Sequence, residues 1–151
     1  VRKLEYPELM ELYEMRTVLE GTAARLAARA ASPVELEELV AINDEMRAAA
    51  GRPEVVIGLN RQFHKLLLDA ARNRFLLRAM ATVENTLLIL GSSSMAKPDR
   101  AREAVDEHRE VLDALLARDG AAAEAAMRRH MERAQFARLR ILRRANAEDG
   151  E

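Results

Sequence analysis

The feature that most constrains this chain is the recurrence of apolar residues every three or four positions along six segments. That spacing places apolar side chains on one face of an α-helix, and no segment alternates apolar and polar residues as a half-buried strand does. Short breakers separate the segments, among them Ser32-Pro33, Gly51-Arg52-Pro53 and Asp119-Gly120. Because short connections join antiparallel neighbours, the sequence predicts an all-α antiparallel bundle.

The limits of these helices follow from capping and breaking residues. Pro7 suits a first helical turn, Ser32 suits an N-cap, and we expect the tail from Asn146 to Glu151 to be frayed. The expected helices span Pro7 to Ala31, Pro33 to Ala50, Glu54 to Ala71, Phe75 to Leu90, Lys97-Pro98-Asp99 to Arg118, and Ala121 to Ala145. We expect the fourth to end at the break Gly91-Ser92-Ser93-Ser94.

Composition removes several classes of function. The 151 residues suit one domain, and the absence of cysteine excludes disulfides, thiol chemistry and cysteine-ligated zinc. A net charge of −1 argues against nucleic-acid binding by electrostatics, and no apolar run reaches the roughly 18 residues of a membrane span. The start, Val1-Arg2-Lys3-Leu4-Glu5, is not a signal peptide, so we expect a cytoplasmic protein without a membrane partner.

Five polar residues fall on the apolar stripes, where core residues are expected. Arg16 lies on the first helix, Asn60 and His64 on the third, His108 on the fifth and His130 on the sixth. A single inward histidine is more often a core residue satisfied by one hydrogen bond. Three neighbouring buried imidazoles cannot all find such partners, whereas one cation satisfies them together.

The three histidines therefore predict a site for one divalent metal ion. Asn60 lies one helical turn before His64 and can reach the same ion. Three imidazoles and an amide oxygen suit Zn²⁺, our first choice, or Ni²⁺, Co²⁺ or Mn²⁺, better than Ca²⁺ or Mg²⁺. With at most four protein ligands, one or more positions stay open to water or an anion.

Arg16 and Asn85 are the candidates for binding a small molecule beside that ion. A guanidinium binds a carboxylate in bidentate fashion, and an arginine near a metal needs an anion between them, so we expect a small carboxylate ligand. The alternatives for Arg16 are a side chain that reaches solvent or a buried ion pair with a glutamate. Asn85, on the fourth helix, is a further candidate for lining the cavity.

An enzyme is the first alternative, and the sequence argues against it. Di-metal oxidases need Glu-x-x-His pairs, but the residues three before the histidines are Arg61, Val105 and Met127. A mononuclear metal enzyme acting on an organic acid would need an inward carboxylate near the histidines, and we expect Glu107 on a different helix face from His108. The second alternative is a metal-free dimerisation module whose histidines are core packing.

Four segments carry a resemblance to one known family. They are residues 12–20 (LYEMRTVLE) followed by Ala27-Ala28, residues 60–67 (NRQFHKLL) followed by 70–73, residues 107–115 from Glu107-His108-Arg109 onward, and Asp119 with residues 127–131 (MRRHM). In this order they resemble the FCD domain, the C-terminal effector-binding domain of FadR-subfamily GntR transcriptional regulators. The second segment is similar to the family's Asp-x-x-Phe-His segment, and the resemblance covers nearly the whole chain.

The resemblance implies a dimeric bundle of six or seven helices over residues 1–151 that binds a metal through an aspartate and three histidines. It also implies a small carboxylate effector beside the metal, held in part by the position of Arg16, and DNA binding only through an N-terminal winged-helix domain. That domain is absent from this chain, which begins at Val1 without an initiator methionine. Asn60 departs from the family's aspartate and brings no charge, so the metal is expected to be held more weakly.

Overall fold

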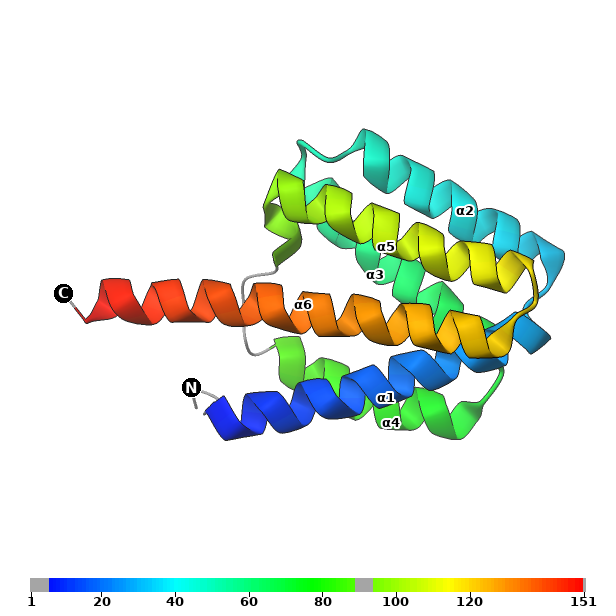
Figure 1. Cartoon of the computed structure of the whole chain (residues 1–151), viewed down its shortest axis with the longest axis horizontal. Helices are drawn as coiled ribbons and strands as arrows, with labels where there is room; N and C mark the ends of the chain where they lie inside the picture. The colour runs from blue at the N-terminus through cyan, green and yellow to red at the C-terminus, as the bar shows by residue number, and fades with distance from the viewer. Residues whose placement is uncertain (1–5, 89–93, 151) are drawn as a thin grey trace.

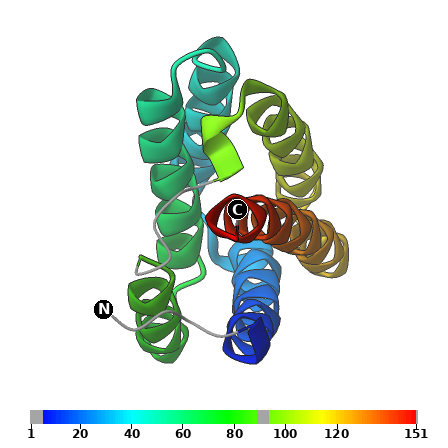
Figure 2. The ribbon, with the colours of Figure 1, turned by 90° about the vertical axis from the view of Figure 1, so that its left-hand side faces the viewer.

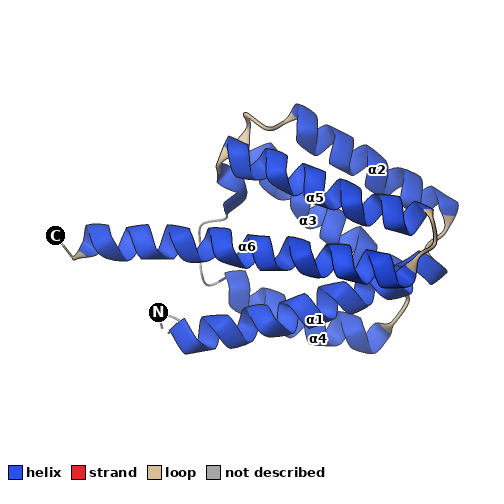
Figure 3. Ribbon diagram, in the orientation of Figure 1, coloured by secondary structure: helices blue, strands red, loops and turns tan. Residues whose placement is uncertain are grey.

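The computed structural model describes residues 6–88 and 94–150, and over these ranges the chain forms six α-helices and one short 3-10 helix, with no strand (Figure 3). The prediction of an all-α bundle is confirmed. The elements are α1 (Tyr6–Ala30), α2 (Pro33–Ala48), α3 (Pro53–Ala70), α4 (Arg74–Leu88), η1 (Ser94–Ala96), α5 (Pro98–Leu116) and α6 (Gly120–Asp149).

The helix starts follow the expected chemistry. Ser32 caps α2 by accepting from the amide of Glu35, and the Glu35 carboxylate accepts from the Ser32 amide, which makes a capping box. Pro53 and Pro98 open α3 and α5, where a missing amide hydrogen is no loss. The Asp119 side chain accepts from the amide of Ala122 and caps α6.

Two arginines end helices and also bind a third helix. Arg72, after α3, and Arg118, after α5, adopt positive φ values of 52° and 56°, the left-handed conformation that often ends a helix. Their guanidinium groups donate to carbonyls at the C-terminal end of α1: Arg72 to Ala30, and Arg118 to Ala31 at 2.6 Å. Since the last carbonyls of a helix have no partner within it, these contacts satisfy α1 and fix the ends of three helices together.

The helices pack in a continuous arrangement around the centre of the molecule. α1 lies along α6, α6 along α5, α5 along α2, and α2 along α3, while α4 covers the other side of α1 (Figures 1 and 2). The C-terminal part of α6 projects beyond the bundle (Figure 1). The helices that carry the three histidines, α3, α5 and α6, therefore face one another across the interior.

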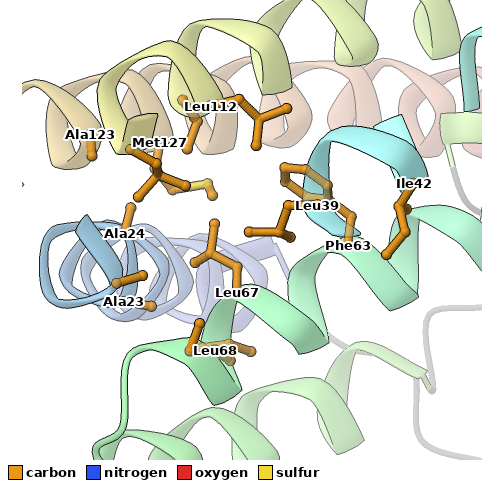
Figure 4. Close-up of a cluster of buried hydrophobic side chains, with 14 of the residues drawn as sticks. Ala23, Ala24, Leu39, Ile42, Phe63, Leu67, Leu68, Leu112, Ala123 and Met127 are labelled. Carbon is orange, nitrogen blue, oxygen red and sulfur yellow. The ribbon is translucent and has the colours of Figure 1, made fainter. Parts of the chain in front are cut away.

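Small residues on α1 permit the closest packing in the core. Ala23, Ala24, Ala27 and Ala28 are almost fully buried, and Ala24 points towards Ala123 and Met127 of α6 (Figure 4). Larger side chains from the other helices fill the remaining interior; among them are Leu39, Phe63, Leu67 and Leu112. Close-packed apolar residues of this kind leave little freedom to the polar side chains that share the interior.

The structure differs from the expected helices at two places. α6 continues to Asp149, so the expectation that the helix ends at Ala145 and frays from Asn146 is wrong. Residues 145–149 contain no glycine or proline, and Ala145, Ala147 and Glu148 favour helix. Ser94 belongs to η1 rather than to an open loop, while Leu90 and the rest of the predicted break, 91–93, lie outside the described residues. No helix within the described ranges has the length and apolar character to cross a membrane.

Candidate metal centre

The structure brings His64, His108 and His130 together in the interior. They lie on α3, α5 and α6 and are 5%, 0% and 2% exposed. One ring nitrogen from each lies within 4.8 Å of the other two, and the Nε2 atoms of His108 and His130 are 3.1 Å apart. Residues separated by up to 66 positions thus form one cluster that could hold a metal ion.

The expectation that three neighbouring buried imidazoles cannot all find hydrogen-bond partners is wrong, since the outer nitrogen of each has its own acceptor. Nδ1 of His64 lies 3.0 Å from Glu20 Oε2, and Nδ1 of His130 lies 2.6 Å from Glu107 Oε1. Nδ1 of His108 lies 3.1 Å from Asn43 Oδ1, and the Asn43 amide nitrogen donates to the carbonyl of Val105, which fixes the amide orientation. Since carboxylate and amide oxygens only accept here, the three Nδ1 atoms carry the hydrogens.

In these tautomers each Nε2 atom carries a lone pair, and the lone pairs of His108 and His130 point at each other. Burial, with the nearby imidazoles, holds the pKa of His108 well below its usual value, and burial, with His64 and Arg100, does the same for the pKa of His130. Both rings are therefore neutral near pH 7, and their Nε2 atoms face each other without a hydrogen between them. Nε2 of His64 has no hydrogen-bond partner in the part of the chain that the structure describes. A cation between the rings would turn this unfavourable arrangement into a favourable one.

The spacing also suits a metal. A Zn–N bond of 2.0–2.1 Å in tetrahedral geometry places two nitrogens about 3.3 Å apart, close to the 3.1 Å between His108 and His130. The ring of Phe63 stacks on that of His108 with centroids 4.1 Å apart and planes 6° from parallel. This contact and the hydrogen bond from Asn43 fix the ring of His108, so the residues present fit a metal ion.

A cavity of about 500 Å³ opens beside the histidines. Five of the six predicted site residues line it: Arg16, Asn60, His64, Asn85 and His130. The sixth, His108, lies behind them and is fully buried. This volume is typical of a site for a small molecule.

The charges and unsatisfied atoms of the cavity favour an anion. Its lining carries Arg16, Arg61, Lys65 and Arg138 against Asp69 and Glu84. Nε of Arg16 and Oδ1 of Asn60 are buried and have no hydrogen-bond partner among the residues described. A buried donor or acceptor without a partner is costly, so both atoms are suited to contact a ligand or an ion.

Three polar residues around the histidines were not among the predicted site residues. Asn43 and Glu20 are 2% and 0% exposed, and each accepts from one imidazole. Glu107 lies on a different face of α5 from His108, as expected, but this face is also buried: Glu107 is 5% exposed and accepts from His130. α5 is covered by both α2 and α6, so two adjacent faces of this helix are buried, and the second face carries Glu107.

Comparison with known proteins gives the family. The model of the FCD domain matches residues 11–133. A protein of Paenarthrobacter nicotinovorans described as "Probable D-xylose utilization operon transcriptional repressor" is 34% identical over 136 residues, which are 87% of this chain and 58% of that protein. The chain thus spans about three-fifths of the length of this relative, which is named as a regulator and not as an enzyme.

Two solved structures share the fold. E. coli McbR/YncC superposes with a TM-score of 0.80 at 21% identity, covering 94% of this chain and 69% of that one. The metal-free FCD domain of TM0439 gives a TM-score of 0.75 at 18% identity and covers 93% of this chain and 98% of that one. The family match over residues 11–133 agrees with this architecture, and the chain belongs to the FCD domain family.

Proposed function

We propose that this chain is the effector-sensing and dimerisation domain of a transcriptional regulator of the GntR type, FadR subfamily. In this proposal His64, His108 and His130, assisted by Asn60, bind a divalent metal ion. Arg16 and Asn85 contact a small carboxylate effector beside it. Binding of the effector alters DNA binding by an N-terminal winged-helix domain outside residues 1–151, in a homodimer. The relative that is named as a transcriptional repressor supports this proposal.

One observation carries the proposal: one ring nitrogen from each of the three histidines lies within 4.8 Å of the other two, and His64 and His130 line a cavity that Arg16 also lines. The ion would supply positive charge and open coordination positions at the cavity, and the guanidinium would supply two parallel donors. A carboxylate is the ligand that uses both. An apolar ligand would leave the buried Nε of Arg16 without a hydrogen-bond partner among the residues described.

The donor set favours a transition metal. Imidazole nitrogens suit Zn²⁺, Ni²⁺ and Co²⁺, while Ca²⁺ and Mg²⁺ prefer sites made of oxygens. The chain offers three imidazoles and the amide oxygen of Asn60, without a carboxylate among these four. We therefore propose Zn²⁺ as the resident ion, with Ni²⁺, Co²⁺ or Mn²⁺ able to replace it.

A thermal-shift screen of small carboxylic acids tests the proposal. The chain would be loaded with Zn²⁺ or treated with a chelator, and each acid added at millimolar concentration. A true effector stabilises the folded state by mass action, so at least one acid should raise the unfolding temperature of the loaded protein and lose most of this effect after chelation.

Two arginine variants of α1 serve as the test and its control. Arg16→Gln should abolish the shift caused by the acid, whereas Arg29→Gln, at an exposed position on the same helix, should leave it unchanged. No stabilising acid in the whole screen, or equal shifts in both variants, would contradict the proposed role of Arg16.

A further inference from the structure

Glu20 is a carboxylate in the interior without a full ion-pair partner. Its side chain on α1 is completely buried, and Oε2 accepts from Nδ1 of His64 at 3.0 Å. Oε1 has no hydrogen-bond partner among the residues that the structure describes, and within them no lysine or arginine lies at ion-pair distance from Glu20. A buried charge is normally paired, so the charge of this side chain needs an explanation.

The contact with His64 has the geometry of a carboxylate that orients a metal-binding imidazole: Oε2 accepts from Nδ1, which leaves Nε2 free to face an ion. A carboxylate oxygen therefore lies one imidazole away from the metal-facing nitrogen of His64.

The other buried carboxylate beside the histidines differs in this respect. Glu107 bonds to His130, but Arg100 also binds both of its oxygens at 2.8 Å. Arg100 is itself buried, so this pair carries no net charge. Asn43, the partner of His108, is neutral. Among the three acceptors, Glu20 is the carboxylate that has no arginine or lysine partner in the ranges the structure describes.

The atoms proposed to contact the ion are all neutral. A histidine binds a metal ion through the lone pair of a neutral imidazole, and Asn60 can offer an amide oxygen. Two positive charges of a metal would then face no negative atom of the chain in direct contact. An acceptor on the far nitrogen of a ligating histidine makes the near nitrogen a better donor, and a charged acceptor does so more than an amide.

We propose that Glu20 is a positioning residue of the metal centre, which orients His64 and supplies through it the negative charge that the neutral ligand set lacks. This inference rests on the proposed metal site. It also explains why an otherwise unpaired carboxylate occurs in the core: the charge has a partner when the ion is bound.

The variant Glu20→Gln tests the role of the charge. Glutamine has nearly the same shape and can still accept from Nδ1 of His64, so it keeps the orientation and removes the charge. Affinity for Co²⁺ and Zn²⁺ would be measured in chelator-treated protein by competition with a chelating dye. We expect a loss of about 10–100-fold and a shifted visible absorption band of bound Co²⁺. Glu14→Gln, at an exposed position of the same helix, should bind as the wild type does.

The stability of the metal-free protein separates this role from a structural one. If Glu20 serves the metal, Glu20→Gln should not lower the unfolding temperature of the metal-free protein, because it removes a buried charge that lacks a full partner. If the variant instead loses stability without metal and binds the ion with the affinity of the wild type, the proposal is overturned.

A double-mutant cycle with Asn60→Asp gives an independent measurement. Asn60→Asp places a negative charge beside the ion, so it should restore much of the affinity lost in Glu20→Gln and improve the wild type by a smaller factor. Glu20→Asp, which keeps the charge, should bind more tightly than Glu20→Gln. Equal effects of Asn60→Asp in both backgrounds would overturn the proposal. A wild type that binds no metal would overturn the proposed metal site as well, which is a different result from unchanged binding in Glu20→Gln.

Discussion

At the scale of single residues, each imidazole of the cluster is fixed by a hydrogen bond from the ring nitrogen that faces away from the centre. Glu20, Asn43 and Glu107 accept from the three Nδ1 atoms, and this fixes both the rotation of each ring and the position of its hydrogen. The Nε2 atoms are therefore oriented before any ion arrives. A preorganised site of this kind loses less conformational freedom on binding than one that must assemble around the metal.

The same burial makes the stability of the metal-free protein depend on pH. The pKa values of His108 and His130 are lowered in the folded state mainly by burial, whereas the unfolded chain takes up protons near pH 6.5. Below pH 6.5 the unfolded state binds more protons, so stability should fall as the pH falls, by about 1.4 kcal/mol per pH unit for each imidazole. Urea unfolding of chelator-treated protein at pH 7.5 and 5.5 checks this. A midpoint that stays constant or rises at pH 5.5 would show that the two rings are not buried in neutral form.

Much of the centre could be predicted from the stripes, because polar residues on an apolar face stand out. The stripes of the third, fifth and sixth helices placed His64, His108 and His130 inward, and all three are buried. Asn43 is likewise a polar residue on the apolar stripe of α2, which contains Leu36, Leu39 and Met46. Its burial could therefore have been predicted from the sequence.

Glu20 was harder to find from the sequence. The stripe predicted for the first helix runs through Leu12, Arg16 and Leu19, which are only half-buried. The buried face is rotated towards Tyr13, Glu20 and Ala24, because α1 is covered on one side by α6 and on another by α4. Alanine is a weak marker of the interior, and so the alanine-rich half of this helix did not reveal the rotation.

At the scale of helices, the start of α2 depends on its cap. Ser32 and Glu35 satisfy each other's backbone amides, so Ser32→Ala should lower the free energy of unfolding by about 1 kcal/mol. Chemical denaturation measures the change. Asp44→Ala, at an exposed position within the same helix, should cost less or nothing. Equal losses in the two variants would mean that the cap does not contribute as the geometry indicates.

Helix limits were predictable where proline, serine or aspartate marks them and less so elsewhere. Ser32, Pro53, Pro98 and Asp119 each occupy a helix start in the structure. The positive φ values of Arg72 and Arg118 carry no such marker, because arginine rarely adopts this conformation and is held in it here by contacts with the end of α1. Those contacts depend on packing between distant segments, which local sequence does not encode.

At the scale of the whole molecule, the metal would link three helices that are distant in the sequence. His64, His108 and His130 come from α3, α5 and α6, so an ion bound by all three favours the folded bundle over the unfolded chain. At a free-metal concentration 100 times the Kd, the gain is about 2.7 kcal/mol, which is roughly 5–10 °C in unfolding temperature for a chain of this size. The cavity lies between α1, α3, α4 and α6, beside this ion. A ligand that binds in the cavity would therefore also stabilise the folded bundle.

Titration of chelator-treated protein with Co²⁺, followed by visible absorption and then by thermal unfolding, tests the central claim most directly. We predict saturation at one ion per chain, an absorption band typical of nitrogen-ligated Co²⁺, and a higher unfolding temperature. His130→Ala should lose all three, and His108→Ala should behave alike. A wild-type chain without saturable binding, or a His130→Ala variant that binds Co²⁺ as tightly as the wild type does, would contradict the metal centre.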